Sequence, residues 1–103
     1  MNNDRMLQML SLAQRAGKVV SGEFMTENAV KEGKSQLVIL AADASDNTKK
    51  KFTDMCQFRN VPILIHADRE VLGHAIGKEF RASISVNDRG LAEEIRKRAT
   101  EVV

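Results

Sequence analysis

The apolar run "LVIL" at residues 37–40 constrains the fold more than any other feature of the chain. A strand with one solvated face alternates apolar and polar residues, whereas a strand covered on both faces is apolar throughout. Three further strands are expected, at "KVVSG" (18–22), at "PILIH" (62–66) and at "RASISV" (81–86). Pro62 opens its strand at the position where a missing N–H costs least. The chain therefore needs helices on both sides of a sheet.

Helical periodicity fills the intervals between these strands. Helices are expected at 4–16, 23–32, 46–59 and 69–76, and from Asp88 onward. Their inner faces carry Met6, Met9, Leu10, Ala13 and Ala16 in the first, Met25, Ala29 and Val30 in the second, Phe52, Met55 and Cys56 in the third, and Leu91, Ala92, Ile95, Ala99 and Val102 in the last. Gly17 and Gly33 would end the first two helices, Ser45 would cap the third, and Asp88 would cap the last.

This alternation of helices and strands, with short links, is typical of an α/β protein. It predicts a three-layer α/β/α sandwich with a four-stranded mixed sheet and about five helices. There is no linker, repeat or low-complexity tract, so residues 1–103 are expected to form a single domain.

Composition excludes several classes of protein. No apolar run is long enough to span a membrane, and no secretory signal precedes Asp4 and Arg5. The single cysteine, Cys56, allows no internal disulfide and fits a reducing compartment, so a cytoplasmic protein is expected. Only four of the residues are aromatic, all Phe, which disfavours an RNA-stacking sheet. The net charge of +2 permits phosphate binding without demanding it.

"GKS" at 33–35 resembles the end of a phosphate-binding loop, but the context is wrong. Such a loop has a glycine where this chain has Asn28, and it leads from a strand into a helix rather than from a helix into a strand. Gly33 is most simply the end of a helix. The basic clusters "TKKK" (48–51) and "RKR" (96–98) are typical of solvated helix faces.

No pattern of catalytic or metal-binding residues stands out. His66 and His74 lie too far apart in sequence for a common metal-ligand spacing, and Cys56 lies on an apolar helix face, where an inert thiol is expected. Asp43 and Asp46 lie where helix caps are common. The sequence thus predicts no enzyme, metal, cofactor or small-molecule substrate.

The junction at Gly22 is the most informative remaining feature. A strand that ends on glycine and turns at once into a helix presents free N–H groups and a positive dipole end. Such a surface suits a phosphate backbone or a base edge. An exposed Phe24 could stack on an extruded base, whereas the amphipathic pattern places Met25 inward.

Four stretches of the chain resemble a known family in their order and spacing over residues 7–86. They are "LAQRAGKVVSGE", "LVILAADAS", "TKKKFTDMCQFRNVPI" and "LGHAIGKEFRASISV". Together they look like the kink-turn-binding ribosomal-protein superfamily, which includes an archaeal and eukaryotic large-subunit ribosomal protein. In detail they resemble its small bacterial members of the YlxQ and YbxF type. The resemblance implies the same sandwich, no catalysis, and binding to sharply kinked RNA.

In RNA-binding archaeal members, the helix start reads Gly-x-Asn-Glu-x-x-Lys. This chain keeps the glycine as Gly22 and has Phe24, Met25 and Asn28 at the other three positions. Asn and Glu would read guanine edges and Lys would meet phosphate, so the side chains here differ in chemistry. Lys31, one turn further on, could supply the lost charge.

The resemblance also implies a second RNA contact, at the loop before the last strand, "EFRAS" (79–83). The leading hypothesis is a non-enzymatic, cytoplasmic, ribosomal-protein-like protein that binds structured RNA, either kink-turn-like or ribosomal, with ribosome association left open. It requires the bend after Gly22 and the stretch near Arg81 to form one surface. The implied RNA-binding residues are Gly22, Glu23, Phe24, Met25, Asn28, Lys31, Arg81, Ala82 and Ser83.

Two alternatives remain open. The same fold could serve as a protein-interaction module, with Phe24, Met25 and Phe80 as an apolar patch. A small hydrolase or transferase would instead need a concave pocket that gathers His66, His74 or the pair of Asp43 and Asp46, with shifted pKa values.

Overall fold

The structure is a computed structural model that describes residues 4–100. Five helices and four strands alternate along the chain, in the order α1 (Arg5–Arg15), β1 (Val19–Ser21), α2 (Glu23–Lys31), β2 (Leu37–Leu40), α3 (Asp46–Arg59), β3 (Ile63–Ile65), α4 (Arg69–Ala75), β4 (Ser83–Val86) and α5 (Arg89–Ala99). Val102, expected on the inner face of the last helix, lies outside the described residues. No helix in the described range is long and apolar enough to cross a membrane.

The four strands form one mixed sheet in the order β1-β4-β2-β3. β4 is antiparallel to both of its neighbours, with Ser21 opposite Ile84 on the β1 side, whereas β2 and β3 are parallel. The insertion of β4 between β1 and β2 matters for the site, because it brings residues near 21 beside residues near 83.

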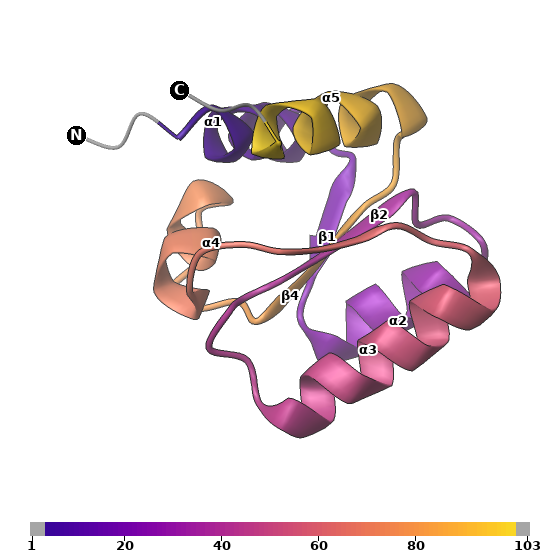
Figure 1. Ribbon diagram of the computed structural model, residues 1–103. Coiled ribbons are helices and arrows are strands. Elements are labelled where there is room, and N and C mark those ends of the chain that lie inside the picture. The colour runs from indigo at the N-terminus through magenta and orange to yellow at the C-terminus, as the bar shows by residue number, and fades with distance from the viewer. Residues whose placement is uncertain (1–3, 101–103) are drawn as a thin grey trace.

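The helices cover both faces of the sheet (Figure 1), which confirms the three-layer α/β/α prediction. Helices α1 and α5 pack together on one face, α2 and α3 lie on the other, and α4 lies beside α1. The run 37–40 is fully buried, and its side chains alternate between two core clusters. Leu37 and Ile39 belong to the cluster under α1, α4 and α5, whereas Val38 and Leu40 pack with Phe52 under α2 and α3.

Side-chain caps fix the starts of four helices. Asp4, Ser45, Asp68 and Asp88 each accept a hydrogen bond from a backbone N–H in the first turn of the helix that follows. The caps predicted at Ser45 and Asp88 are therefore confirmed. Helix α2 differs from the other four, because its cap is Gly22 and no side chain closes its first turn.

Three sequence expectations about local burial and strand bounds were wrong. Met25 is 48% exposed, because Thr26 takes the inward position that the apolar pattern assigned to Met25. Ala16 is exposed because it follows the last turn of α1, and Leu7 is buried on that helix instead. The last strand begins at Ser83 rather than at residue 81, so Arg81 belongs to the preceding loop.

Candidate functional site

The end of β1 and the start of β4 lie side by side, although about sixty residues separate them in the chain. The backbone N–H of Gly22 donates to the carbonyl oxygen of Ser83 over 2.9 Å. Beside it, Nε of Arg81 donates to Oγ of Ser21 over 2.9 Å. The bend after Gly22 and the stretch near Arg81 therefore form one continuous surface.

The first turn of α2 opens onto this surface. Gly22 has φ 92° and ψ 159°, a backbone conformation that side-chain-bearing residues rarely adopt. Its carbonyl accepts from the N–H of Thr26, which starts the helical ladder. Within residues 4–100, the backbone N–H groups of Glu23, Phe24 and Met25 have no hydrogen-bond partner. These groups and the helix dipole favour an anion at this end of α2.

Arg81 supplies a cation to the same surface. Its Nε bonds Ser21, and its Nη1 donates to the carbonyl oxygen of Phe80 over 2.6 Å. A guanidinium has five N–H donors, so three stay available. Arg81 pairs with no carboxylate in the described part of the chain. Its charge is therefore held in place but not neutralised.

Three large apolar side chains are exposed on the same two segments. Phe24 is 73% exposed, Met25 48% and Phe80 54%. Several large exposed apolar side chains on neighbouring segments indicate a binding surface more clearly than isolated ones do, because folding normally buries such groups. The surface thus combines hydrogen-bond donors, a cation and flat apolar groups.

The flank of α2 that faces α3 is occupied by ion pairs. Glu27 contacts Nζ of Lys31 at 2.7 Å and Nζ of Lys51 at 2.5 Å, and Lys51 also lies 3.8 Å from Glu23. These lysines lower the pKa of Glu27, and Glu27 raises the pKa of Lys51. Lys31 therefore carries a partly offset charge, and it lies two turns beyond Phe24.

The opposite flank of α2 faces β1. Asn28 is half-buried there and lines a small pocket of about 170 Å³ together with Val20, Met25, Lys34 and Asn87. This pocket lies on the side of the helix away from the ion pairs. Asn28 and Glu23 thus lie on different flanks of α2.

The loop before β4 is positioned by helix α4. The N–H of Arg81 donates to the carbonyl oxygen of Arg69 over 3.0 Å. Gly73 is buried, and a Cβ built on it would lie 2.8 Å from the carbonyl oxygen of Glu79 and 2.9 Å from Cα of Phe80. The loop can approach α4 only because residue 73 has no side chain. Sequence reasoning missed this role, although a glycine inside a helical pattern is a signal for close approach.

Ala82 and Ser83 contribute mainly through their backbone. Ser83 is 1% exposed. The carbonyl oxygen of Ala82 accepts a hydrogen bond from the N–H of Ala41, the residue that follows β2. Their side chains therefore form the support beneath the surface, whereas Arg81 and Phe80 form its outer part.

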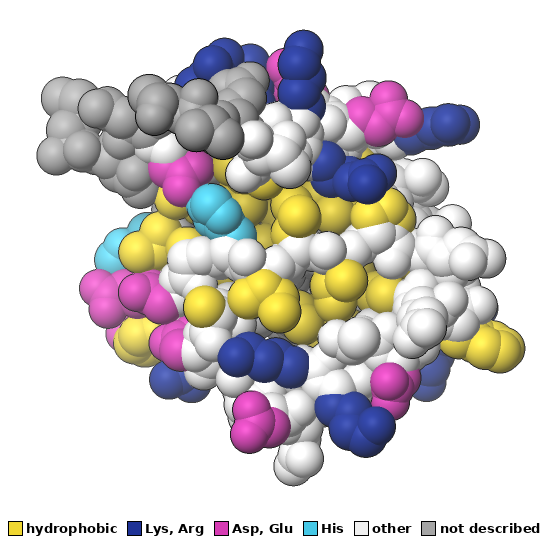
Figure 2. Space-filling view, viewed as in Figure 1, with side chains coloured by type: hydrophobic (Ala, Val, Ile, Leu, Met, Phe, Trp, Pro, Cys, Tyr) yellow, Lys and Arg dark blue, Asp and Glu magenta, His cyan; other side chains and the backbone are white. Residues whose placement is uncertain are grey.

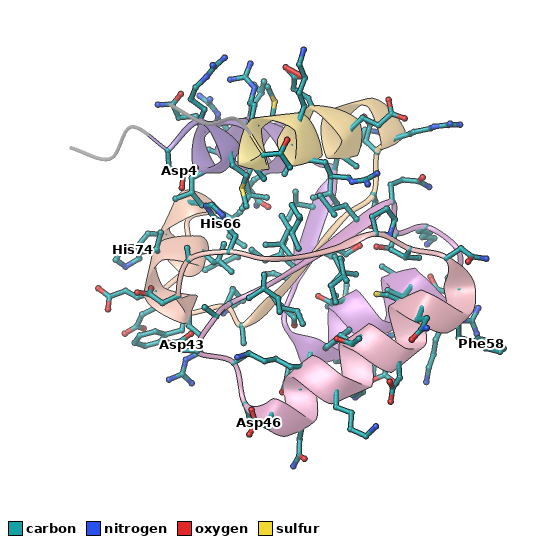
Figure 3. The ribbon with its side chains drawn as sticks, in the orientation of Figure 1. Asp4, Asp43, Asp46, Phe58, His66 and His74 are labelled. Atoms are coloured by element: carbon teal, nitrogen blue, oxygen red, sulfur yellow. The ribbon has the colours of Figure 1, made fainter. Side chains whose placement is uncertain are left out.

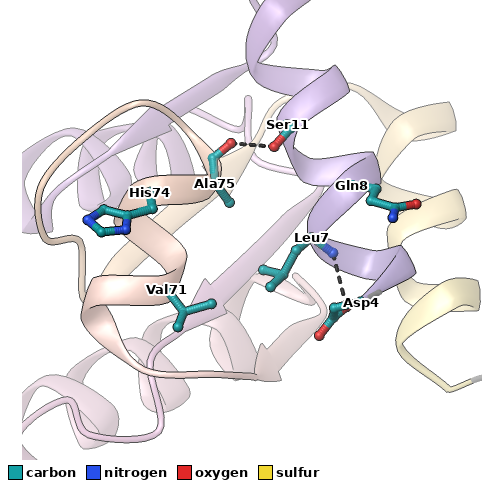
Figure 4. Close-up of a pocket in the computed structure, with 7 residues that line it drawn as sticks. All are labelled: Asp4, Leu7, Gln8, Ser11, Val71, His74 and Ala75. Atoms are coloured by element: carbon teal, nitrogen blue, oxygen red, sulfur yellow. Dashed lines mark hydrogen bonds between the residues drawn. The ribbon is translucent and has the colours of Figure 1, made fainter. Parts of the chain in front are cut away.

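The residues proposed for an enzyme do not come together (Figure 3). His66 Nε2 lies 2.7 Å from Oδ2 of Asp4, and Asp43 pairs with Arg69, whereas Asp46 lies on the first turn of α3. His74 lines a pocket of about 330 Å³ between α1 and α4 (Figure 4), which His66, Asp43 and Asp46 do not line. Among the described residues, no three potential metal ligands form a cluster.

Cys56 is buried as predicted, at 1% exposure. Burial raises the pKa of its thiol to about 11. The thiolate that nucleophilic chemistry requires is therefore scarce at neutral pH.

The sequence model of the Ribosomal protein L7Ae/L30e/S12e/Gadd45 family matches residues 4–95. The chain belongs to this family, which confirms the resemblance noted from its motifs.

Relatives and solved structures agree with this assignment. The chain is 45% identical to "RNA-binding protein YlxQ" of Bacillus subtilis over 84% of this chain and 87% of that protein, and 26% identical to "Large ribosomal subunit protein eL8" of Thermoplasma volcanium over 98% and 84%. A protein of unknown function from Bacillus halodurans has a TM-score of 0.93 at 37% identity, covering 96% of this chain and 100% of that one. A Giardia lamblia 15.5kD RNA binding protein shares the fold, with a TM-score of 0.78 at 23% identity over 99% and 94%.

Proposed function

We propose that this chain is a non-enzymatic, cytoplasmic RNA-binding protein that docks a kink-turn-like or ribosomal RNA. The RNA would bind the α2–β4 surface, defined as Gly22, Glu23, Phe24, Met25, Asn28 and Lys31 of the α2 segment with Arg81 of the facing loop, and with Ala82 and Ser83 as the backbone support beneath it. The observation that carries the proposal is the hydrogen-bonded junction that places Arg81 beside the open start of α2.

Phosphate would bind between the first turn of α2 and Arg81. The N–H groups at the helix start favour negative charge, and the guanidinium beside them adds a full positive charge with donors to spare. Because Arg81 is anchored to Ser21 and Phe80, little side-chain entropy is lost when it meets a phosphate. Lys31 would add a weaker contact at the far end of α2, because its ion pair with Glu27 must break before the ammonium group can meet a phosphate.

Bases would be held mainly by stacking. Phe24 and Met25 replace the side chains that hydrogen-bond guanine edges in archaeal relatives, so they cannot read bases in the same way. An unpaired base splayed from a kinked helix can instead stack on Phe24, which is largely exposed. Asn28 keeps an amide that can bond a base edge or a phosphate. We expect tolerance of base identity and dependence on RNA shape.

The relatives support an RNA ligand. YlxQ of Bacillus subtilis and of Enterococcus faecium are both named RNA-binding proteins, at 45% and 32% identity. These names guide the choice of ligand to test.

The test is a calorimetric titration of the chain with a kink-turn RNA and with a fully paired duplex of equal length. The proposal predicts tighter binding to the kinked RNA and weaker binding as salt rises. Equal affinity for the two RNAs would contradict kink-turn recognition. Absence of binding to either RNA at low salt would remove the RNA proposal.

The exposed apolar side chains also suit a protein partner on the same surface. Phosphate binding gives no role to the exposed apolar side chains of Phe24, Met25 and Phe80. Pulldown from lysate with and without nuclease separates the two functions. Partners retained after nuclease, and lost on Phe24→Ala, would favour the protein-interaction module.

A further inference from the structure

Strand β3 forms an open edge of the sheet. It pairs with β2 alone, at the end of the order β1-β4-β2-β3. The segment between α3 and α4 that contains β3 crosses in front of β2 in the view of Figure 1. This edge lies at the opposite side of the sheet from β1, and therefore away from the start of α2.

Within residues 4–100, the backbone of β3 has groups along this edge that no hydrogen bond pairs. Toward β2, the carbonyl of Pro62 accepts from the N–H of Val38, and the N–H of His66 donates to the carbonyl of Leu40. In a parallel pair of strands, every second residue bonds the neighbouring strand. Pro62 and His66 bond β2, so Ile63 and Ile65 direct their N–H and C=O groups away from it. Such groups form a template for another extended chain.

The side chains at this edge are apolar, with basic groups beside them. Ile65 is 56% exposed. A groove of about 560 Å³ runs between the strand and the end of α5, lined by Pro62, Ile63, Leu64, Glu93, Arg96, Lys97 and Thr100. Figure 2 shows hydrophobic side chains across the middle of this face, with Lys or Arg side chains above them.

The charge of the groove is positive. Oε1 of Glu93 lies 3.2 Å from Nε of Arg89, so the negative charge of Glu93 is offset. Arg96 and Lys97 are exposed and have no carboxylate partner among residues 4–100. An occupant of the groove thus meets two free cations.

We propose that the β3 edge binds an extended acidic segment of a protein partner, which adds to the sheet as a fifth strand. Its backbone would pair with the outward groups of Ile63 and Ile65, an apolar side chain would cover Ile65, and carboxylates would meet Arg96 and Lys97. Charge complementarity selects this occupant over a second copy of the chain, because two β3 edges would bring the same cations together. A nucleic acid would satisfy the cations, but it has no strand to match the unpaired backbone groups or Ile65.

The test is an NMR titration of the ¹⁵N-labelled chain with a synthetic peptide that alternates valine with glutamate. A peptide that alternates valine with lysine and a uridine oligonucleotide are the comparison ligands. We expect the acidic peptide to shift the amides of Ile63 and Ile65 and to slow their hydrogen exchange. The lysine peptide and the oligonucleotide should leave both amides unprotected.

Two variants separate the contributions of charge and backbone. The double substitution Arg96→Glu and Lys97→Glu should weaken binding of the acidic peptide by roughly tenfold or more. It should also make the lysine peptide the better ligand. Ile65→Pro should abolish peptide binding, because it removes an outward N–H without removing a bond to β2. An unchanged spectrum outside residues near 65 confirms that this variant is folded.

Three results would overturn the proposal. The first is no protection of Ile63 and Ile65 by the acidic peptide at millimolar concentration. The second is oligonucleotide binding through Arg96 and Lys97, which would assign the groove to nucleic acid. The third is concentration-dependent protection of these amides without peptide, which would assign the edge to a second copy of the chain.

Discussion

Arg81 and Ser21 are joined by a hydrogen bond of 2.9 Å from Nε to Oγ, which links the loop before β4 to the end of β1. The bond fixes the direction of a guanidinium that has no carboxylate partner in the described range. Because Ser21 immediately precedes Gly22, it also sets Arg81 beside the open N–H groups of α2. The affinity of the α2–β4 surface for an anion should depend on this one contact.

Replacing Arg81 tests its role in phosphate binding. Arg81→Gln should weaken kink-turn RNA binding by about 1–2 kcal/mol and lower the salt slope by about one, because one phosphate contact is lost. Arg15→Gln removes an equal charge from an exposed position on α1 and serves as the control. Equal effects of the two substitutions in calorimetry would show that only net charge matters.

Phe24 and Phe58 offer a matched pair for stacking. Both are exposed, at 73% and 83%, but Phe58 lies near the end of α3. Phe24→Ala should weaken RNA binding by about 1–3 kcal/mol, the usual worth of one aromatic–base stack. Phe58→Ala should leave the affinity unchanged, and both variants should unfold at a similar denaturant concentration. Loss of affinity in both variants, or in neither, would contradict the stacking role.

Gly73 and Gly90 test whether α4 positions the loop before β4. A Cβ at residue 73 would collide with the backbone of Glu79 and Phe80, so Gly73→Ala should destabilise the fold by about 1–3 kcal/mol and shift the loop that carries Arg81. At Gly90, on α5, the nearest atom would be Oδ2 of Asp88 at 3.6 Å, an ordinary contact.

Gly90→Ala should therefore stabilise the fold by up to about 1 kcal/mol, because alanine is the better helix former. Urea denaturation measures both effects. A neutral Gly73→Ala that also keeps full RNA affinity would show that the loop does not depend on close packing against α4.

The pair of Asp4 and His66 predicts a dependence of stability on pH. Partial burial would raise the pKa of Asp4, but the hydrogen bonds from His66 and from the N–H of Leu7 outweigh it, so the pKa lies below its ordinary value. A carboxyl group whose pKa is lower in the folded state than in the unfolded state stabilises the fold at any pH above its unfolded-state pKa. This contribution is lost as the pH falls through the folded-state pKa.

Asp4→Asn keeps an oxygen that can cap α1 but removes the charge. The variant should be less stable than the wild type by about 0.5–1 kcal/mol at pH 6, and the difference should shrink as the pH is lowered toward 2. Urea denaturation at both pH values checks this. A difference that persists at the lower pH would mean that the cap, rather than the contact with His66, is disturbed.

The layers of the fold were predictable because they rest on local patterns. The run 37–40 is apolar at every position, and Ser45 and Asp88 are local capping signals, so each could be interpreted without knowledge of its neighbours. The strand order could not be derived in this way. Which strand lies between β1 and β2 depends on contacts between segments about sixty residues apart.

The candidate site was proposed from the sequence only through the family resemblance. Nothing local in the sequence brings Gly22 next to Ser83, and the amphipathic pattern placed Met25 inward where the structure has Thr26. A threonine can fill an inward position that an apolar pattern assigns to its neighbour. Gly73 shows the opposite case. A glycine within a helix is visible in the sequence, but its role became clear only once the structure placed the loop of Glu79 and Phe80 against it.

The most direct test of the RNA proposal is to map where a kink-turn RNA contacts the ¹⁵N-labelled chain by NMR at low salt. We expect the amides of Arg81 and of the α2 start, Gly22, Glu23, Phe24 and Met25, to shift together, because phosphate would lie between the two segments. Amides of α1 and α5 should stay in place. Shifts confined to α1 and α5, or shifts at only one of the two segments, would contradict the claim that they form one RNA-binding surface.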